Sequence, residues 1–142
     1  MKLVICDFNR TLFDPSVRRL YTGAINALRY FQQHGAKVVI LSTEAAERST
    51  LVAQLGLAEY CDEIRFVPEK TKEIVLAIMG QHTARPSEVL IIGDDPEGEL
   101  LIGAQLHLLT VAVGTGYCSP ETATMMGLPF YLSINDITEM NL

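Results

Sequence analysis

Residues 2–14 read KLVICDFNRTLFD, and the beginning of this stretch decides the fold class. The apolar run of residues 3–6 shows no polar alternation, which is typical of a strand buried on both faces of a parallel sheet. The run ends on a carboxylate, Asp7, which the amide Asn9 and the hydroxyl of Thr11 follow. Open parallel sheets bind ligands beyond the carboxyl ends of their strands, so Asp7 is a candidate functional residue.

Further apolar runs recur along the chain and predict the other strands of the sheet. A weaker and more polar run at residues 64–67 predicts an edge strand. Helical patterns, with apolar residues three and four positions apart, separate the runs. The buried runs are residues 4–5, 38–41, 89–92 and 109–113; the predicted helices cover residues 17–31, about 44–55, a segment with Ile74, Val75 and Ile78 that ends near Gly80, the segment DDPEGELLIGAQL (94–106) and a short stretch after Ser133.

The alternation of strands and helices predicts an α/β fold with right-handed crossovers. We expect a Rossmann-like three-layer sandwich with a mostly parallel sheet of about five strands. No linker, internal repeat or low-complexity segment interrupts the pattern, and 142 residues suffice for one substantial core. The sequence therefore predicts a single domain over residues 1–142.

The composition excludes several classes of protein. A content of 49% hydrophobic and 20% charged residues is typical of a globular chain. The formal net charge of −6 argues against nucleic acid or an anionic membrane surface as a partner. The cysteines (Cys6, Cys61 and Cys118) are odd in number and widely spaced, which indicates reduced thiols. We therefore expect a cytoplasmic protein, without a signal peptide or a membrane span.

Polar and charged residues follow four of the predicted strands, and parallel strands bring their carboxyl ends to one edge of the sheet. The edge would thus combine a carboxylate, hydroxyl groups, an ammonium group and an acidic loop. Such a set provides a nucleophile, hydrogen-bond donors, a cation and ligands for a hard metal ion. The segments after the strands are Asp7–Thr11, Ser42-Thr43-Glu44, Pro68-Glu69-Lys70 and GDDPEGE (93–99).

These four segments resemble, in order, the four motifs of the haloacid dehalogenase-like superfamily of phosphohydrolases. The matching stretches read DFNRTL, VVILS, FVPEKTKEIV and VLIIGDDPEGE, and the resemblance covers almost the whole chain. Each motif alone is weak, but four in the family's order, each at a strand end, form a strong signal. The resemblance implies a phosphatase that uses an aspartyl-phosphate intermediate and Mg²⁺.

The resemblance also implies roles for individual residues. Asp7 would be the nucleophile, and Asp94 a magnesium ligand with Asp95 or Glu99 as the second acid; Asp7 and the backbone carbonyl of Asn9 would complete the metal site. Asp95 has a second interpretation, as a cap of the following helix.

The hydroxyl and the cation of the implied site each have two candidates. Ser42, or alternatively Thr43, would bind a phosphoryl oxygen. Lys70, with Lys72 as the competing candidate, would offset the negative charge of the site.

Two further residues of the first motif have implied or open roles. Thr11 would brace the loop that carries the nucleophile. Arg10 stands where the family more often has glycine, and it either holds a substrate anion or lies on the surface.

Asn9 is a departure from the family pattern. The phosphatases of the family carry an aspartate at this position, which protonates the leaving oxygen and later activates water. An amide has no titratable proton near neutral pH, so the general acid–base contribution of ~10²–10⁴-fold is lost. Asp14 on the same loop is a weaker candidate for that role. We therefore expect a slow or selective phosphatase that favours good leaving groups, such as aryl or acyl phosphates.

Two alternatives stay open at this point. The site could bind a phosphorylated ligand or partner without useful turnover. A dehalogenase activity is less favoured, because the dehalogenases of the family use no metal and lack the acidic fourth motif. The chain between the motifs has room for a helix and a short flap but not for a cap domain. Water exclusion would then come from a macromolecular phosphorylated substrate or from a second copy of the chain, whereas a phosphorylated small molecule would leave the site open.

Overall fold

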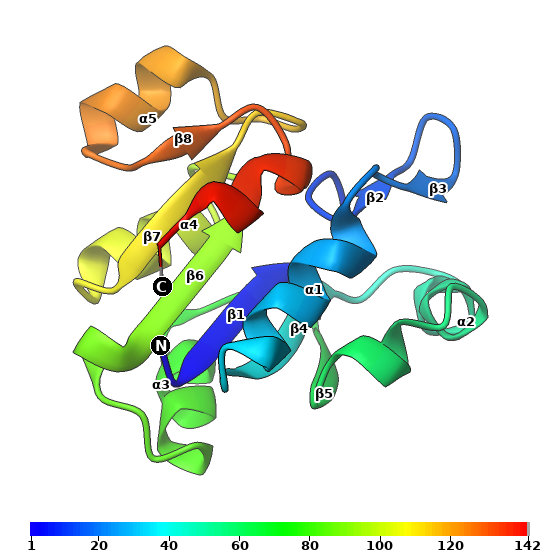
Figure 1. The fold of residues 1–142 in the computed structure, drawn as a ribbon, viewed down its shortest axis with the longest axis horizontal. Helices are drawn as coiled ribbons and strands as arrows, with labels where there is room; N and C mark the ends of the chain where they lie inside the picture. Colours follow the sequence, from blue (N-terminus) through cyan, green and yellow to red (C-terminus); the bar gives the residue numbers. More distant parts are fainter. Residues whose placement is uncertain (142) are drawn as a thin grey trace.

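A six-stranded, fully parallel sheet forms the centre of the protein, in a computed structural model that describes residues 1–141 (Figure 1). The first strand lies in the middle of the sheet, and the chain adds strands on both sides of it. The predicted edge strand is confirmed, because β5 has a neighbour on one side only. In spatial order the strands are β5 (Glu63–Val67), β4 (Lys37–Thr43), β1 (Leu3–Asp7), β6 (Val89–Gly93), β7 (Leu109–Val113) and β8 (Phe130–Tyr131).

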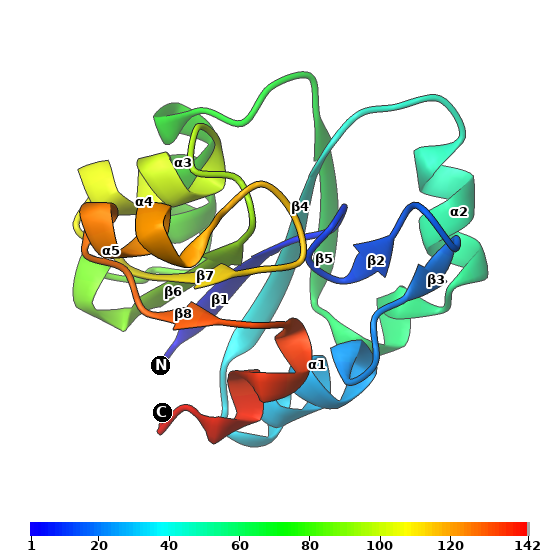
Figure 2. The same cartoon turned by 90° about the horizontal axis from the view of Figure 1, so that it is seen from above.

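Helices cover both faces of the sheet, which confirms the predicted three-layer sandwich (Figure 2). Successive side chains of a strand point to opposite faces, so Val4 and Cys6 face one layer while Leu3 and Ile5 face the other. One layer holds α1 (Ala24–Gln33), α2 (Arg48–Gln54) and the 3-10 helices η1 (Leu57–Tyr60) and η3 (Ile134–Glu139); the other holds α3 (Lys72–Gln81) and α4 (Glu99–Gln105).

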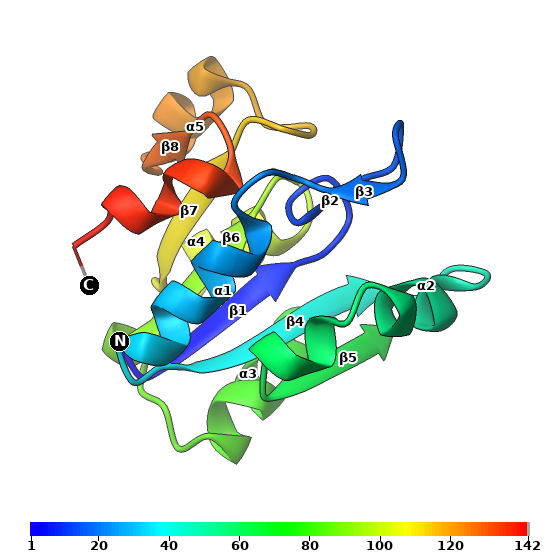
Figure 3. The ribbon, with the colours of Figure 1, turned by 45° about the vertical axis from the view of Figure 1, so that its right-hand side comes forward.

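Two further short elements belong to the fold, and one of them lies near the β8 edge. α5 (Pro120–Met126) packs with β7 and α4 through a small separate core, and η2 (Pro86–Glu88) precedes β6. Figure 3 shows α1 and the C-terminal segment in front of the sheet, with α3 and α4 behind it. None of the helices in residues 1–141 is both long and apolar enough to cross a membrane.

The helix predicted over residues 17–31 is wrong in its first half. The chain there forms a small hairpin of β2 (Phe13–Asp14) and β3 (Arg19–Leu20), and Val17 is 51% exposed at its tip. The Asp14 carboxylate accepts hydrogen bonds from the backbone N–H and the hydroxyl of Ser16. This local turn chemistry overrides the helical spacing, because it satisfies the backbone without a helix.

Three other sequence predictions need correction. The second helix begins at Arg48 and not near residue 44, because Glu47 adopts a left-handed backbone conformation with φ of 62°. The sheet has six strands where about five were expected, because β8 is only two residues long and leaves no hydrophobic pattern. α5 was not predicted, although Ser119 caps it through a hydrogen bond from the Thr122 N–H and Pro120 opens it.

Gly23, at the start of α1, lies against Asn135 of η3. This close contact leads to a prediction about stability. Its φ is +84°, and a Cβ atom would lie 2.2 Å from the Asn135 side-chain oxygen. Gly35 has a similar φ of +82° but open space around it, so it is the matched control. We predict that Gly35→Ala lowers the free energy of unfolding by ~1 kcal/mol through backbone strain alone. Gly23→Ala should cost ~3 kcal/mol because a steric clash is added. Equal losses in urea denaturation would contradict this contact.

Candidate active site

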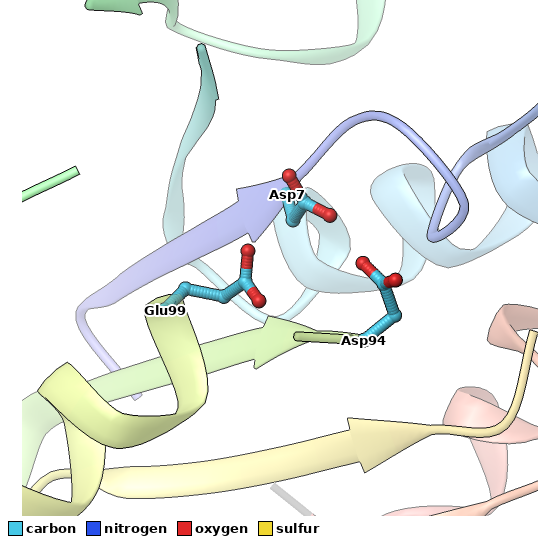
Figure 4. Close-up of side chains that lie close together, drawn as sticks. All are labelled: Asp7, Asp94 and Glu99. Atoms are coloured by element: carbon cyan, nitrogen blue, oxygen red, sulfur yellow. The ribbon is translucent and has the colours of Figure 1, made fainter. Parts of the chain in front are cut away.

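Three buried carboxylates converge at the carboxyl edge of the sheet (Figure 4). Asp7 ends β1, Asp94 follows β6, and Glu99 opens α4. β1 and β6 are neighbouring parallel strands, so their ends place Asp7 and Asp94 side by side. One oxygen from each of the three side chains lies within 4.8 Å of the others. The arrangement is that of a site for a hard cation, since carboxylate oxygens are the ligands that such ions prefer.

Two glycines leave the space that the carboxylates occupy. A Cβ atom on Gly93 would lie 2.3 Å from the Glu99 Cγ atom, and one on Gly116 would lie 1.8 Å from an Asp94 carboxylate oxygen. The Gly-Asp pair of the fourth motif thus has a steric reason, because Glu99 folds back over the end of β6. Gly116 brings the loop after β7 against Asp94.

Lys70 binds two of the three carboxylates. Its Nζ atom donates to Asp7 Oδ1 at 2.5 Å and to Glu99 Oε1 at 2.6 Å, and its side chain is 8% exposed. Lys72 is exposed on α3, one residue after Thr71, whose hydroxyl caps that helix. The structure therefore brings Lys70, and not Lys72, to the carboxylates.

Thr11 and the backbone of Tyr117 contact the second Asp7 oxygen and both Asp94 oxygens. The Thr11 hydroxyl lies 3.0 Å from Asp7 Oδ2 and 3.2 Å from Asp94 Oδ1, between the two acids. The Tyr117 N–H donates to Asp94 Oδ2 at 3.2 Å. Thr11 is fully buried, so its hydroxyl braces the first loop against the end of β6.

Burial and mutual repulsion raise the pKa of two acids in the site. Burial, and then a hydrogen bond and the charge of Asp7, raise the pKa of Asp94 to about 7. Burial and the charge of Asp7 raise the pKa of Glu99 to about 8, although Lys70 opposes the shift. For Lys70, burial alone would lower the pKa, but the charges of Asp7 and Glu99 outweigh it and the pKa is raised. Three carboxylates and one ammonium leave an excess of negative charge, which a divalent cation would neutralise.

Asp95 does not belong to this trio. Its Oδ1 atom accepts the Glu97 N–H at 2.9 Å and so stabilises the turn before α4. The Asp95 N–H donates to Glu99 Oε2 at 2.8 Å, which holds the Glu99 side chain in place. Of the two candidates for the second acid, Glu99 is therefore the one beside Asp7 and Asp94.

A cavity of about 470 Å³ opens above the carboxylates. Asn9, Arg10 and Thr43 line it, together with Asp7 and Lys70. Ser42 is only 1% exposed and is not part of the cavity wall; its hydroxyl donates to the Thr43 carbonyl and accepts a hydrogen bond from Arg48. Of the two hydroxyl candidates, Thr43 is the one that borders the cavity.

Arg10 is part of the cavity wall. Its guanidinium lies 4.9 Å from the centre of the Tyr117 ring, and its carbonyl accepts the Thr115 hydroxyl at 2.5 Å. Its backbone has a φ of 62°, in the left-handed region where glycine is at ease. Contacts of the side chain and the carbonyl thus hold this residue in a strained conformation.

Asp14 is poorly suited to replace the missing acid. Its carboxylate accepts two hydrogen bonds from Ser16, which lower its pKa, and it lines a different cavity beside Tyr21. An acid with a lowered pKa holds no proton near neutral pH.

The cysteine thiols are not reactive groups of this site. Cys6, Cys61 and Cys118 are free thiols, in agreement with the sequence prediction. Cys6 precedes Asp7, but burial raises its pKa well above the ordinary value, and burial raises the pKa of Cys61 to about 11. Because the thiolate is the reactive form, these groups are inert at neutral pH.

Sequence reasoning missed two residues of the cavity wall. Tyr117 lies in the loop after β7, which is a carboxyl-end loop like the other four, so the rule that found those loops would have found it. Arg48 donates to Ser42 and to the Thr43 carbonyl from the start of α2. No motif marks Arg48, because its approach to β4 depends on the path of residues 44–47.

Comparison with known proteins assigns the fold. No family model and no curated protein matches the chain. A solved D,D-heptose 1,7-bisphosphate phosphatase from B. bronchiseptica, complexed with magnesium and phosphate, is 17% identical with a TM-score of 0.77, over 98% of this chain and 97% of that chain. The chain has the haloacid dehalogenase-like fold.

Two further solved structures have a similar fold, and one of them is named for the haloacid dehalogenase-like family. A D,D-heptose 1,7-bisphosphate phosphatase from Burkholderia thailandensis is 17% identical with a TM-score of 0.72, over 98% of this chain and 97% of that chain. A haloacid dehalogenase-like family hydrolase from Streptococcus pneumoniae is 12% identical with a TM-score of 0.77, over 92% of each chain. Identities this low establish the haloacid dehalogenase-like fold alone.

The raised pKa values predict how stability depends on pH. Without divalent cations, the free energy of unfolding should fall by several kcal/mol between pH 5 and pH 9. Asp94 and Glu99 keep protons in the folded state that the unfolded chain releases near pH 4. This stabilisation is complete below the unfolded pKa values and is lost as the pH passes through about 7 and about 8. Urea denaturation at several pH values measures it.

One variant in the site and one control on the surface test whether the pH dependence of stability comes from the site. Asp94→Asn should flatten the pH dependence, whereas Glu121→Gln, which changes an exposed acid at the start of α5, should leave it as in the wild type. Adding Mg²⁺ at pH 9 should restore stability. If the free energy of unfolding of Asp94→Asn depends on pH as in the wild type, the pH dependence does not come from Asp94.

Proposed function

We propose that this protein is a Mg²⁺-dependent phosphatase that acts through an aspartyl phosphate at Asp7. The observation that carries the proposal is the position of Asp7: its carboxylate lies between Lys70 and Thr11, beside Asp94, at the floor of an open cavity. The similar fold of a phosphatase complexed with magnesium and phosphate supports this choice. Asp7, Asp94 and Glu99 would hold the ion, with the Asn9 carbonyl as a further ligand, and the ion would neutralise charge on the phosphoryl oxygens.

The first step of the proposed reaction uses Asp7 as the nucleophile. A bond forms between an Asp7 carboxylate oxygen and phosphorus while the bond from phosphorus to the leaving oxygen breaks. The contacts of Lys70 and Thr11 fix the position of the Asp7 carboxylate, so the attacking group is already in place. Thr43 lines the cavity and would donate to a phosphoryl oxygen, with Ser42 behind it as the alternative donor.

The leaving oxygen receives no proton from Asn9. This loss corresponds to ~3–5 kcal/mol of activation free energy for a leaving group that needs protonation. Asp14 does not compensate, since its carboxylate is bonded to Ser16. We therefore propose a slow enzyme that is selective for phosphoric esters or anhydrides with good leaving groups. Hydrolysis of the aspartyl phosphate also lacks a general base, which makes the second step slow.

Substitution of Asp7 and Asn9 tests the proposed activity directly. Phosphate release from p-nitrophenyl phosphate should require Mg²⁺ in the wild type, and Asp7→Asn should lower it at least ~10³-fold, because the nucleophile is lost. Asn9→Asp should raise it ~10²-fold by restoring the acid and base. The matched control is Asn26→Asp, the same chemical change on the exposed side of α1.

The outcomes of these assays separate enzyme from binder. If the wild type is inert and Asn9→Asp is active, the natural protein binds a phosphorylated ligand without turnover. If the wild type and all three variants are inert while Mg²⁺ binds, the assignment of Asp7 as the nucleophile is contradicted.

The lack of a base at Asn9 predicts accumulation of the intermediate. Mixing the wild type with p-nitrophenyl phosphate and Mg²⁺ in a stopped-flow instrument should give a burst of about one p-nitrophenolate per protein, followed by slow turnover. Asn9→Asp should lose the burst, because its carboxylate activates water against the intermediate. A linear trace for the wild type would show that formation of the aspartyl phosphate, and not its hydrolysis, limits the rate.

A further inference from the structure

A second cavity of about 190 Å³ adjoins the first beside Asn9. Asn9 and Arg48 line both cavities and so form the boundary between them. The side cavity lies between the first loop with its hairpin and the start of α2. Apart from the boundary residues and the charged Arg18 and Glu47, its wall is apolar; that part consists of Phe8, Phe13, Pro15, Ala45, Ala46 and Leu51.

We propose that this side cavity binds the leaving group of the substrate, and that the substrate is an aryl phosphate. This inference rests on the proposed phosphatase function and names its substrate class. A phosphoryl group above Asp7 would direct its leaving oxygen past Asn9 and into the side cavity. The position of Asn9 on both walls makes it the residue beside the scissile bond.

The chemistry of Asn9 limits which leaving groups can depart there. With no acid beside it, the leaving oxygen must depart as an anion that carries the electron pair of the broken bond. A phenol has a pKa near ~10 and an alcohol is several units more basic, so phenolate is the better leaving group. The Asn9 amide N–H can donate to this anion although it cannot protonate it.

The walls of the side cavity suit an aromatic ring. A volume of about 190 Å³ is close to the ~150 Å³ apolar cavity that accepts benzene in an engineered protein core. The Arg48 guanidinium lies 5.9 Å from the centre of the Phe8 ring, at the boundary of the two cavities. Because Arg48 lines both cavities, it would add positive charge beside a phenolate that leaves past Asn9. Phenolate then takes a proton from water, and a second water releases inorganic phosphate from Asp7.

The test compares phenyl phosphate with acetyl phosphate, which also needs no proton but has no ring. Ala46→Trp places a large side chain at an exposed position on the cavity wall and should fill the cavity without disturbing the core. We expect kcat/KM for phenyl phosphate to fall at least ~10-fold, mainly through KM, and that for acetyl phosphate to stay within about twofold. Ala58→Trp, on the exposed side of η1, is the matched control.

A second variant enlarges the side cavity instead of filling it. Leu51→Ala removes part of a wall and should raise kcat/KM for 2-naphthyl phosphate relative to phenyl phosphate. A phosphotyrosyl peptide assayed in parallel distinguishes a free aryl phosphate from a modified protein side chain as the natural source of the ring.

The outcomes distinguish this inference from the proposed function. Suppose that the wild type cleaves both substrates with Mg²⁺, and that Ala46→Trp lowers kcat/KM equally for both or for neither. The side cavity then does not bind the leaving group, and the phosphatase assignment stands. If neither the wild type nor Asn9→Asp cleaves phenyl or acetyl phosphate, both proposals fail together.

Discussion

The site depends on the ion pairs that the buried ammonium group of Lys70 forms. It pairs with Asp7 from the central strand and Glu99 from α4, so it joins two segments that are far apart in the sequence. Removing one partner of a buried ion pair leaves an uncompensated charge, which costs ~3–5 kcal/mol. The end of β1, the loop before α3 and the start of α4 are thereby fixed relative to one another, and Thr11 holds Asp94, which follows β6, against the same centre.

This centre is arranged for function at some cost to stability. One ammonium faces three carboxylates, and the raised pKa values of Asp94 and Glu99 record the excess of negative charge. A chain selected for stability alone would not place three acids in a buried site, since repulsion and desolvation both oppose it. Sites that violate local stability rules in this way are commonly functional. Gly93 and Gly116 show that backbone space is also reserved for these side chains.

Asn9 affects proton transfer in the proposed reaction but not the binding of the phosphoryl group. In the proposed reaction, Lys70, Thr11 and the three carboxylates would position and charge-stabilise a phosphoryl group, whereas Asn9 would give the leaving oxygen no proton. Under this proposal, the stability of the substrate's own leaving group would set the selectivity, in place of an acid of the protein. The apolar cavity next to Asn9 is consistent with this shift, because it offers a binding place for a group that can leave as an anion.

The sequence by itself determined the alternation of strands and helices, and with it the edge at which Asp7, Lys70 and Asp94 meet. Buried parallel strands have continuous apolar runs, and their carboxyl ends share one edge, so chain order sufficed. The positions of individual side chains depended on the tertiary structure: Glu99, and not Asp95, joins Asp7 and Asp94, and Thr43, and not Ser42, borders the cavity. Two residues of similar chemistry in one segment, such as Ser42 and Thr43, are distinguished by the direction of their side chains. The packing of loops and helices on the sheet sets that direction.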